Sequence, residues 1–218
     1  MQRTIYLLSP LVKEETISLP MIEFSLVADS IDLSSCNTLM FTSKQAVKSA
    51  EEINPKWKEL PCLAIGSATA RQIKSLGGTV CYQSTSFYGE SLGHDIIEKF
   101  HNKKILYLRP KEISFDSKAL LAKHDIVLEE QIIYETHCKH YPKKEKPIKN
   151  AIIVFTSPST IECFFKNFVW DESYTAIVIG KSTKNHLPQY VSFVVANEPT
   201  IDACLHKANE ILLTSNSK

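Results

Sequence analysis

Short apolar runs alternate along the chain with stretches in which apolar residues recur every three or four positions. The short runs are bounded by turn residues and predict buried strands, while the periodic stretches predict amphipathic helices. Ser9-Pro10 predicts a helix start, and an extended run follows from Ile17 to Val27. The other expected strands are Ile5–Leu8, Leu39–Thr42, Leu63–Ile65, Thr79–Tyr82, Ile105–Leu108, Ile126–Thr136, Ile152–Phe155, Ile177–Ile179 and Phe193–Val195.

Amphipathic helices are expected between these strands. Ser43 is expected to cap a helix that buries Val47, Ala50 and Ile53, and Gly77-Gly78 is expected to end the helix that begins at Ala70. The other helical stripes are Leu92/Ile96/Ile97/Phe100, Ala119–Leu121, Ile161/Phe164/Phe165/Phe168 and Ile201/Leu205/Ala208/Leu212.

Two strand-turn-helix motifs occur twice at one spacing. MFTSKQAV from Met40 is echoed by VFTSPST, and LAIGSATA from Leu63 is echoed by IVIGKST. Ser43 and Ser157 are 114 positions apart, as are Gly66 and Gly180. An internal repeat of this kind predicts two structurally similar lobes.

The alternation of strands and helices predicts an α/β fold in which each lobe has a parallel five-stranded sheet flanked by helices. ILYLRP at 105–110 is echoed by IYLLSP at 5–10, so the repeat wraps around the chain ends. We therefore expect a discontinuous outer lobe of residues 1–35 plus 138–218 and an inner lobe of residues 36–137. Two extended crossovers, near 20–35 and 132–150, would join the lobes, with a cleft between them.

Composition narrows the class of protein. The 218 residues are 44% apolar and carry a net charge of +1, which argues against a nucleic-acid partner. No apolar stretch is long enough for a secretory signal or a membrane span, so we expect a cytoplasmic protein without a membrane partner. No apolar stripe is left over for an interface, which favours a monomer. The six cysteines form no Cys-x-x-Cys pair and are expected to be reduced core thiols.

Candidate ligand contacts lie where strands run into helices. In doubly wound sheets, ligands bind beyond the carboxyl ends of the strands, and helix N-termini present N–H groups to carboxylates or phosphates. Serine and threonine also cap helices for structural reasons alone, but the recurrence of both turns favours a ligand role. The candidate substrate-binding residues are Thr42, Ser43, Gly66, Ser67, Thr69, Arg109, Thr156, Ser157, Gly180, Lys181, Ser182 and Thr183.

Several stronger chemical signals are missing from the sequence. There is no GxGxxG, and Gly180-Lys181-Ser182 lacks the upstream glycine of a P-loop, since Thr175 stands there. The histidines show no metal-ligand spacing, and no nucleophile elbow is present. The pattern therefore favours a binder of an anionic small molecule that uses no cofactor and no metal.

The ordered set FTS, AIGSATA, IIYET, VFTSPST and IVIGKSTKN resembles the uroporphyrinogen-III synthase family over nearly the whole chain. The resemblance implies an enzyme, a lyase that closes the linear tetrapyrrole hydroxymethylbilane to uroporphyrinogen III. The reaction releases water and inverts ring D through a spiro intermediate, in porphyrin and heme biosynthesis. The resemblance also implies that no cofactor takes part and that hydroxymethylbilane synthase (porphobilinogen deaminase), which supplies the substrate, is a transient partner.

The family resemblance also assigns residue roles. Tyr134 matches the family's tyrosine in the return crossover, which implies a catalytic phenol that assists departure of the hydroxyl group. Ser157 and the pair Ser182-Thr183 match the loops that hold substrate carboxylates in the outer lobe. Ser43, Ser67 and Thr69 match the inner-lobe counterparts, and Lys44, Lys181 and Lys184 are plausible charge partners.

Two other classes of function remain compatible with the pattern. A two-lobed cytosolic module that binds or senses a small anion would also have two crossovers and ligand loops, but would bind without conversion. A nucleotide-sugar transferase with two Rossmann-like lobes is a third possibility, although the chain is short for one and lacks glycine-rich nucleotide loops.

Overall fold

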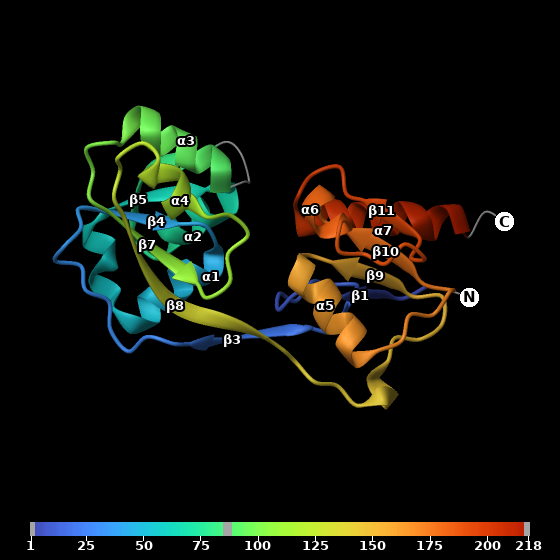
Figure 1. The fold of residues 1–218 in the computed structure, drawn as a ribbon. Helices are drawn as coiled ribbons and strands as arrows, with labels where there is room; N and C mark the ends of the chain where they lie inside the picture. Colours follow the sequence, from blue (N-terminus) through green and yellow to red (C-terminus); the bar gives the residue numbers. More distant parts are fainter. Residues whose placement is uncertain (1–2, 85–88, 216–218) are drawn as a thin grey trace. The chain divides into compact units, whose positions relative to one another are not determined.

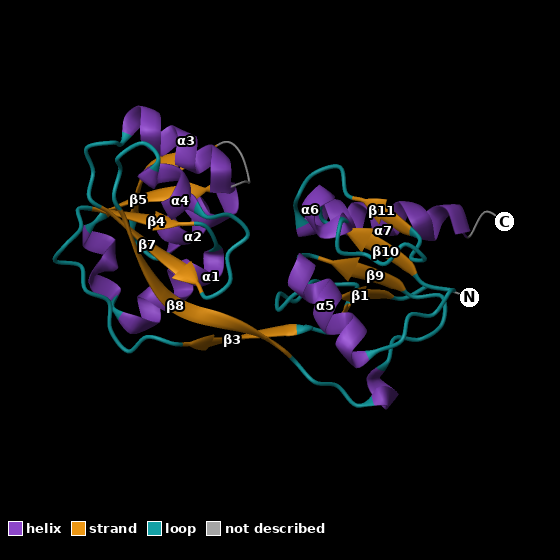
Figure 2. Cartoon of the chain, in the orientation of Figure 1, coloured by secondary structure: helices purple, strands orange, loops and turns teal. Residues whose placement is uncertain are grey.

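The computed structural model describes residues 3–84 and 89–215. The chain divides into two compact units, Met1–Glu23 with His137–Lys218 and Phe24–Thr136, which we call the outer unit and the inner unit. Each unit is a layered α/β structure with helices on both faces of a sheet (Figures 1 and 2). No helix among the described residues is both long enough and apolar enough to cross a membrane.

The outer unit is built around a five-stranded sheet with the strand order β11-β10-β9-β1-β2, whose neighbouring strands are all parallel. It therefore combines two N-terminal strands with three strands that follow residue 150, as the wrapped repeat predicts. The strands are β1 (Ile5–Leu7), β2 (Ile17–Ser18), β9 (Ile152–Phe155), β10 (Thr175–Val178) and β11 (Phe193–Val195). The helices are η2 (Lys143–Glu145), α5 (Pro158–Asn167), α6 (Lys181–Lys184) and α7 (Ile201–Ser215).

Each face of the outer sheet is covered by one long helix. Leu7 and Val154 belong to a buried cluster with Cys204 and Ala208 of α7. Phe155 contacts Phe164 of α5 edge-on, with ring centroids 5.5 Å apart. The periodic apolar positions of both helices thus form the core, as expected for amphipathic helices on a sheet.

The inner unit contains a six-stranded sheet with the order β3-β8-β7-β4-β5-β6. The strands are β3 (Ile22–Leu26), β4 (Thr38–Phe41), β5 (Pro61–Ile65), β6 (Thr79–Ser84), β7 (Ile105–Pro110) and β8 (Leu128–Cys138). The helices are α1 (Lys44–Ile53), η1 (Pro55–Glu59), α2 (Gly66–Ser75), α3 (Gly89–Lys99) and α4 (Ser117–Ala122).

Alternation along β4 explains how the inner sheet is covered. Leu39 and Phe41 pack in one cluster with residues of α1 and α2, whereas Met40 packs in another with residues of α3 and α4. Successive side chains of a strand point to opposite faces, so both faces of β4 are apolar and buried.

The inner sheet has six strands instead of the expected five because β3 joins it, and this shifts the boundary of the inner unit. Residues 24–35, which the sequence analysis places in the outer lobe, belong to the inner unit. The physical reason is packing: Phe24 contacts Tyr134 edge-on at 5.8 Å, and Ile31 lies in the buried cluster with Leu39.

The helix expected after Ser9-Pro10 is absent, because residues 8–16 form a loop. The sequence there offers no apolar face to bury, since Val12 is 77% exposed and charged residues follow it. Glu15 adopts a left-handed conformation with φ of 63°, which ends any helical path.

Cys138 and Cys163 form a disulfide, so the expectation that all six cysteines are reduced is wrong. Cys163 is buried on α5, as expected of a core thiol, but nothing in the sequence pattern indicates that the end of β8 brings Cys138 beside it. Cys36, Cys62, Cys81 and Cys204 are free thiols.

We expect Cys138→Ser to lower the unfolding free energy of the oxidised protein by about 3 kcal/mol, because the disulfide closes a loop between residues 25 positions apart. Denaturant unfolding with and without reductant measures this: reductant should destabilise the parent by a similar amount and leave the variant unchanged. Six reactive thiols in the denatured, unreduced parent, instead of the four expected, would contradict the disulfide.

Candidate active site

The turn after β4 places two hydroxyl side chains at the carboxyl end of the inner sheet. Ser43 has extended backbone angles and its Oγ accepts a hydrogen bond of 3.0 Å from the Ala46 N–H, so it caps α1. Thr42 and Ser43 are both half-buried and therefore remain partly accessible.

Each of these hydroxyls is joined to a tyrosine from another strand. The Ser43 Oγ lies 2.9 Å from the Tyr134 Oη of β8, and the Thr42 Oγ1 lies 2.8 Å from the Tyr107 Oη of β7. Thr42 and Ser43 are adjacent at the end of one strand, so their side chains diverge toward opposite faces, where the two tyrosines pack in different clusters. Tyr134 was among the residues predicted from the sequence, whereas Tyr107 was not.

Tyr134 is held as a neutral phenol. Its side chain is 4% exposed, and this burial raises the pKa of the phenol, an effect only partly offset by the hydrogen bond with Ser43. The phenol therefore keeps its proton throughout the neutral range and can act as a hydrogen-bond donor, not as a base.

The second inner turn leads from β5 into α2 without a side-chain cap. Gly66 adopts φ of +66°, a left-handed conformation that favours glycine. No side chain of the preceding residue caps the helix, so the first-turn N–H groups of this ten-residue helix suit an anion. Ser67 is exposed beside these groups, whereas Thr69 is 5% exposed and points into the core.

Arg109, a candidate substrate contact, is turned toward the protein itself. Its Nη1 donates to the carbonyl oxygens of Pro110 and Lys111 at 2.9 and 3.1 Å. Its Nε lies 3.4 Å from Glu130 Oε2 in a pair whose side chains are 16% and 13% exposed. These contacts give Arg109 a role in holding β7 to β8.

In the outer unit, the turn at Thr156 and Ser157 is closed on itself by a capping box. Ser157 Oγ accepts from the Thr160 N–H, and the N–H groups of both Thr156 and Ser157 donate to Thr160 Oγ1. The N–H groups of Thr156, Ser157 and Thr160 are thus occupied, and the half-buried Ser157 hydroxyl lies 3.0 Å from Ser159 Oγ.

The other outer turn presents two exposed residues and one buried one. Gly180 is extended, and Lys181 and Ser182 at the start of α6 are exposed. Thr183 is only 1% exposed, so its hydroxyl belongs to the core of this turn.

A family model described as uroporphyrinogen-III synthase HemD matches residues 10–206. The crystal structure of uroporphyrinogen-III synthetase from Helicobacter pylori is 29% identical, with a TM-score of 0.82 over 96% of this chain and 99% of that chain. A mutant uroporphyrinogen III synthase from the extremely thermophilic bacterium Thermus thermophilus, 11% identical over 98% of this chain and 99% of that chain, shares the fold with a TM-score of 0.60. No curated protein matches the chain. The chain belongs to the uroporphyrinogen-III synthase family.

Uroporphyrinogen-III synthases are lyases of porphyrin biosynthesis, and the activity expected from the sequence is therefore confirmed. The enzyme cyclises hydroxymethylbilane to uroporphyrinogen III, with loss of water and inversion of ring D. Because the product is cyclic and its substrate is flexible, the task of such a synthase is largely to hold reacting atoms in one geometry.

A group of cations on the inner unit of this synthase was identified only in part by the sequence analysis. Partial burial and the neighbouring charges of Lys48 and Arg71 lower the pKa of Lys44, which follows the Thr42-Ser43 turn directly. Because like charges repel, the three cations destabilise one another, and an anion that binds among them relieves this repulsion. The signal for Lys48 was its position four residues after Lys44 on α1, whereas Arg71 lies on α2 and needed the fold to reveal it.

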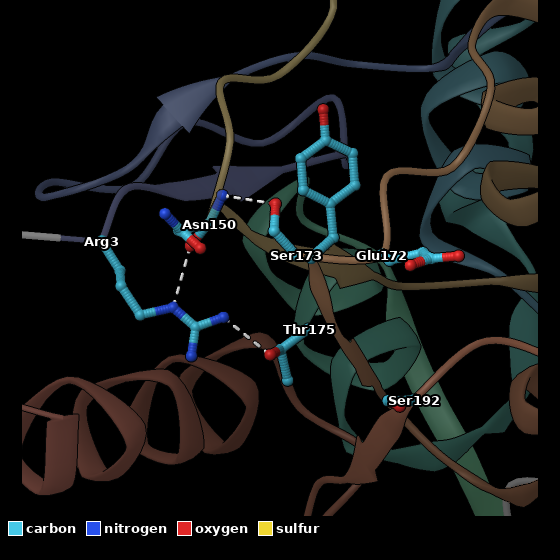
Figure 3. A pocket seen from close by; sticks show the side chains of 7 residues that line it. Arg3, Asn150, Glu172, Ser173, Thr175 and Ser192 are labelled. Carbon is cyan, nitrogen blue, oxygen red and sulfur yellow. Dashed lines mark hydrogen bonds between the residues drawn. The ribbon is translucent and has the colours of Figure 1, made fainter.

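A pocket of about 470 Å³ lies at the opposite, amino-end edge of the outer sheet (Figure 3). Arg3 reaches across it and donates from Nε to the Asn150 carbonyl at 2.8 Å and from Nη2 to Thr175 Oγ1 at 2.7 Å. Glu172 and Ser192 also line it, and none of the predicted site residues does. Its arginine thus ties the start of β10 to the segment before β9.

Proposed function

We propose that Tyr134 is the catalytic residue of the cyclisation and that it donates a hydrogen bond to the departing hydroxyl group. The observation that carries this role is the hydrogen bond between Ser43 and Tyr134. Either oxygen of this pair can donate; because Ser43 Oγ already accepts the Ala46 N–H, we assign the Ser43 proton to the Tyr134 oxygen.

That arrangement leaves the Tyr134 proton free for a substrate atom. When the carbon–oxygen bond of the terminal hydroxymethyl group breaks, negative charge develops on the leaving oxygen, and a phenol donor stabilises it. The oxygen departs as water by taking the Tyr134 proton, and the proton lost from the pyrrole carbon that forms the new bond returns to the phenol. A drop in the rate of type III formation in Tyr134→Phe, with folding intact, is the test of this role.

We propose that the carboxyl-end turns of both sheets bind the carboxylates of hydroxymethylbilane. Carboxylates are acceptors only, and the turns offer donors: hydroxyls of Thr42, Ser43 and Ser67, and the uncapped N–H groups of α2. In the outer unit the accessible donors are Ser157, Lys181 and Ser182. The remaining candidates, Gly66, Thr69, Arg109, Thr156, Gly180 and Thr183, act by shaping these turns.

Ser182→Ala is expected to raise KM for the bilane roughly threefold to tenfold with kcat unchanged, because it removes one hydrogen bond to a charged group that is made before and during the reaction. Steady-state kinetics with enzymatically generated bilane measures this. Ser192→Ala, an exposed serine at the amino-end edge of the same unit, is the matched control and should behave like the parent. Equal KM values for both variants would remove Ser182 from the binding set.

We further propose that the enzyme works in the cytoplasm as a monomer and receives its substrate through transient contact with hydroxymethylbilane synthase. Four of the six cysteines are free thiols, which fits a reducing compartment, whereas the Cys138–Cys163 disulfide is of a kind that is rare there. Light scattering coupled to size-exclusion chromatography tests the monomeric state. The contact is tested by adding an excess of inactive hydroxymethylbilane synthase, which should compete for it and change the lag before the bilane is converted.

A further inference from the structure

Tyr107 is a buried phenol that the proposed reaction leaves without a role. Its side chain is 3% exposed and packs in an apolar cluster with Met40, Leu63 and Leu128. A phenylalanine would fill the same space without a polar atom. Burying a hydroxyl costs free energy unless it is hydrogen-bonded, so the bond between Tyr107 Oη and Thr42 Oγ1 accounts for its presence.

The direction of this hydrogen bond follows from acidity. Burial raises the pKa of the Tyr107 phenol to about 12, so the phenol is neutral and keeps its proton at any physiological pH. A phenol is a stronger acid than an aliphatic alcohol and is therefore the better donor. Either oxygen of this pair can donate; Thr42 Oγ1, unlike Ser43 Oγ, accepts no N–H group among the described residues, so we assign Tyr107 as the donor and the Thr42 oxygen as the acceptor.

Thr42 consequently has one proton left to give. A threonine hydroxyl has one donor and two acceptor positions, and the Tyr107 bond occupies an acceptor position. Thr42 is half-buried, so its own O–H can reach a group from outside, and Lys44 two residues later provides a positive charge nearby. A carboxylate, which only accepts, matches this donor.

We propose that Tyr107 is a positioning residue that fixes the Thr42 hydroxyl as a hydrogen-bond donor to a carboxylate of the substrate. The inference rests on the proposed binding of substrate carboxylates by the turn after β4. The phenol withdraws electron density from the Thr42 oxygen, which makes its proton a stronger donor than that of an isolated threonine.

Two separate hydroxyl chains pass through this turn, one on each face of the sheet, and each offers a donor to the ligand. One leads from Tyr107 through Thr42, and the other from the Ala46 N–H through Ser43 to Tyr134. The first chain ends in the Thr42 hydroxyl, which binds a substrate carboxylate. The second ends in the Tyr134 phenol, which assists the leaving group. The difference predicts that the first chain affects KM and the second affects kcat.

The test compares Tyr107→Phe, Thr42→Val and the double variant in steady-state cyclisation of hydroxymethylbilane. Tyr107→Phe should raise KM roughly fivefold, Thr42→Val should raise it roughly fivefold to tenfold, and kcat should stay within about twofold in both. The double variant should match Thr42→Val, because Tyr107 acts only through Thr42. Tyr82→Phe is the matched control: its phenol oxygen contacts Lys99 Nζ instead, and its KM should equal that of the parent.

A parental KM in Tyr107→Phe, or a double variant whose effects simply add, overturns the inference. If Tyr107→Phe does not fold, judged by thermal unfolding, Thr42→Ser decides: it keeps the hydroxyl and should keep a parental KM, whereas a KM like that of Thr42→Val contradicts the donor role. The proposed catalytic role fails separately, through an unchanged kcat in Tyr134→Phe.

Discussion

Tyr134→Phe is expected to lower kcat for the cyclisation of hydroxymethylbilane about 100-fold while KM changes by less than about twofold. The substitution keeps the ring, its edge-on contact with Phe24 and its burial, and removes only the hydroxyl that lies 2.9 Å from Ser43 Oγ. The hydrogen bond to the leaving group exists mainly in the transition state, so its loss appears in kcat. Single-turnover rates of type III formation measure the effect.

The pH dependence of the parent provides a second view of the same phenol. Burial raises the pKa of the Tyr134 phenol above its ordinary value. The phenol therefore loses the proton that the reaction needs only at a pH above that of an ordinary tyrosine. The parent should therefore show no fall in kcat from this group between pH 7 and 9. Tyr82→Phe controls for removal of a phenol elsewhere in the inner unit, and a Tyr134→Phe variant with parental kcat would remove Tyr134 from the mechanism.

Phe164→Ala is expected to destabilise the outer unit by about 3–5 kcal/mol, because it empties the centre of an aromatic cluster. Phe164 is fully buried, and its ring lies 5.5–6.0 Å from those of Phe155, Phe165, Phe168 and Trp170. Denaturant unfolding, monitored by hydrogen exchange in α5 and α7, measures the loss of stability in the outer unit alone. A separate measurement is needed because the two units need not unfold together.

Phe165→Ala is the matched control for that change. Phe165 neighbours Phe164 on α5 but is only half-buried, so its truncation leaves a smaller cavity and should cost clearly less. Equal losses for the two variants would mean that the cluster is not centred on Phe164.

The periodicity of the chain predicted the layered fold well, because strands and helices that bury both faces of a parallel sheet carry a strong local signal. The run Leu39–Thr42 and the cap Ser43 lie where the pattern placed them. The loop at residues 8–16 was mistaken for a helix because Ser9-Pro10 is a start signal even where no apolar face follows.

The candidate site was predictable in its turns and not in its contacts. Sequence placed Ser43 and Tyr134 among the candidates, but the bond between Thr42 and Tyr107 depends on β7 lying beside β4, a neighbour relation between residues 65 positions apart. The buried position of Thr183 and the inward turn of Arg109 likewise depend on packing. Local pattern cannot distinguish a hydroxyl that caps a turn from one that faces a ligand.

The central claim is that this chain directs ring closure to the type III isomer. The most direct measurement generates hydroxymethylbilane with its deaminase, adds the protein, oxidises the products and separates the uroporphyrin isomers. The account predicts predominantly type III, in proportion to enzyme added. Type I alone, with the protein shown to be folded by circular dichroism, would contradict it and would favour a module that binds the anion without converting it.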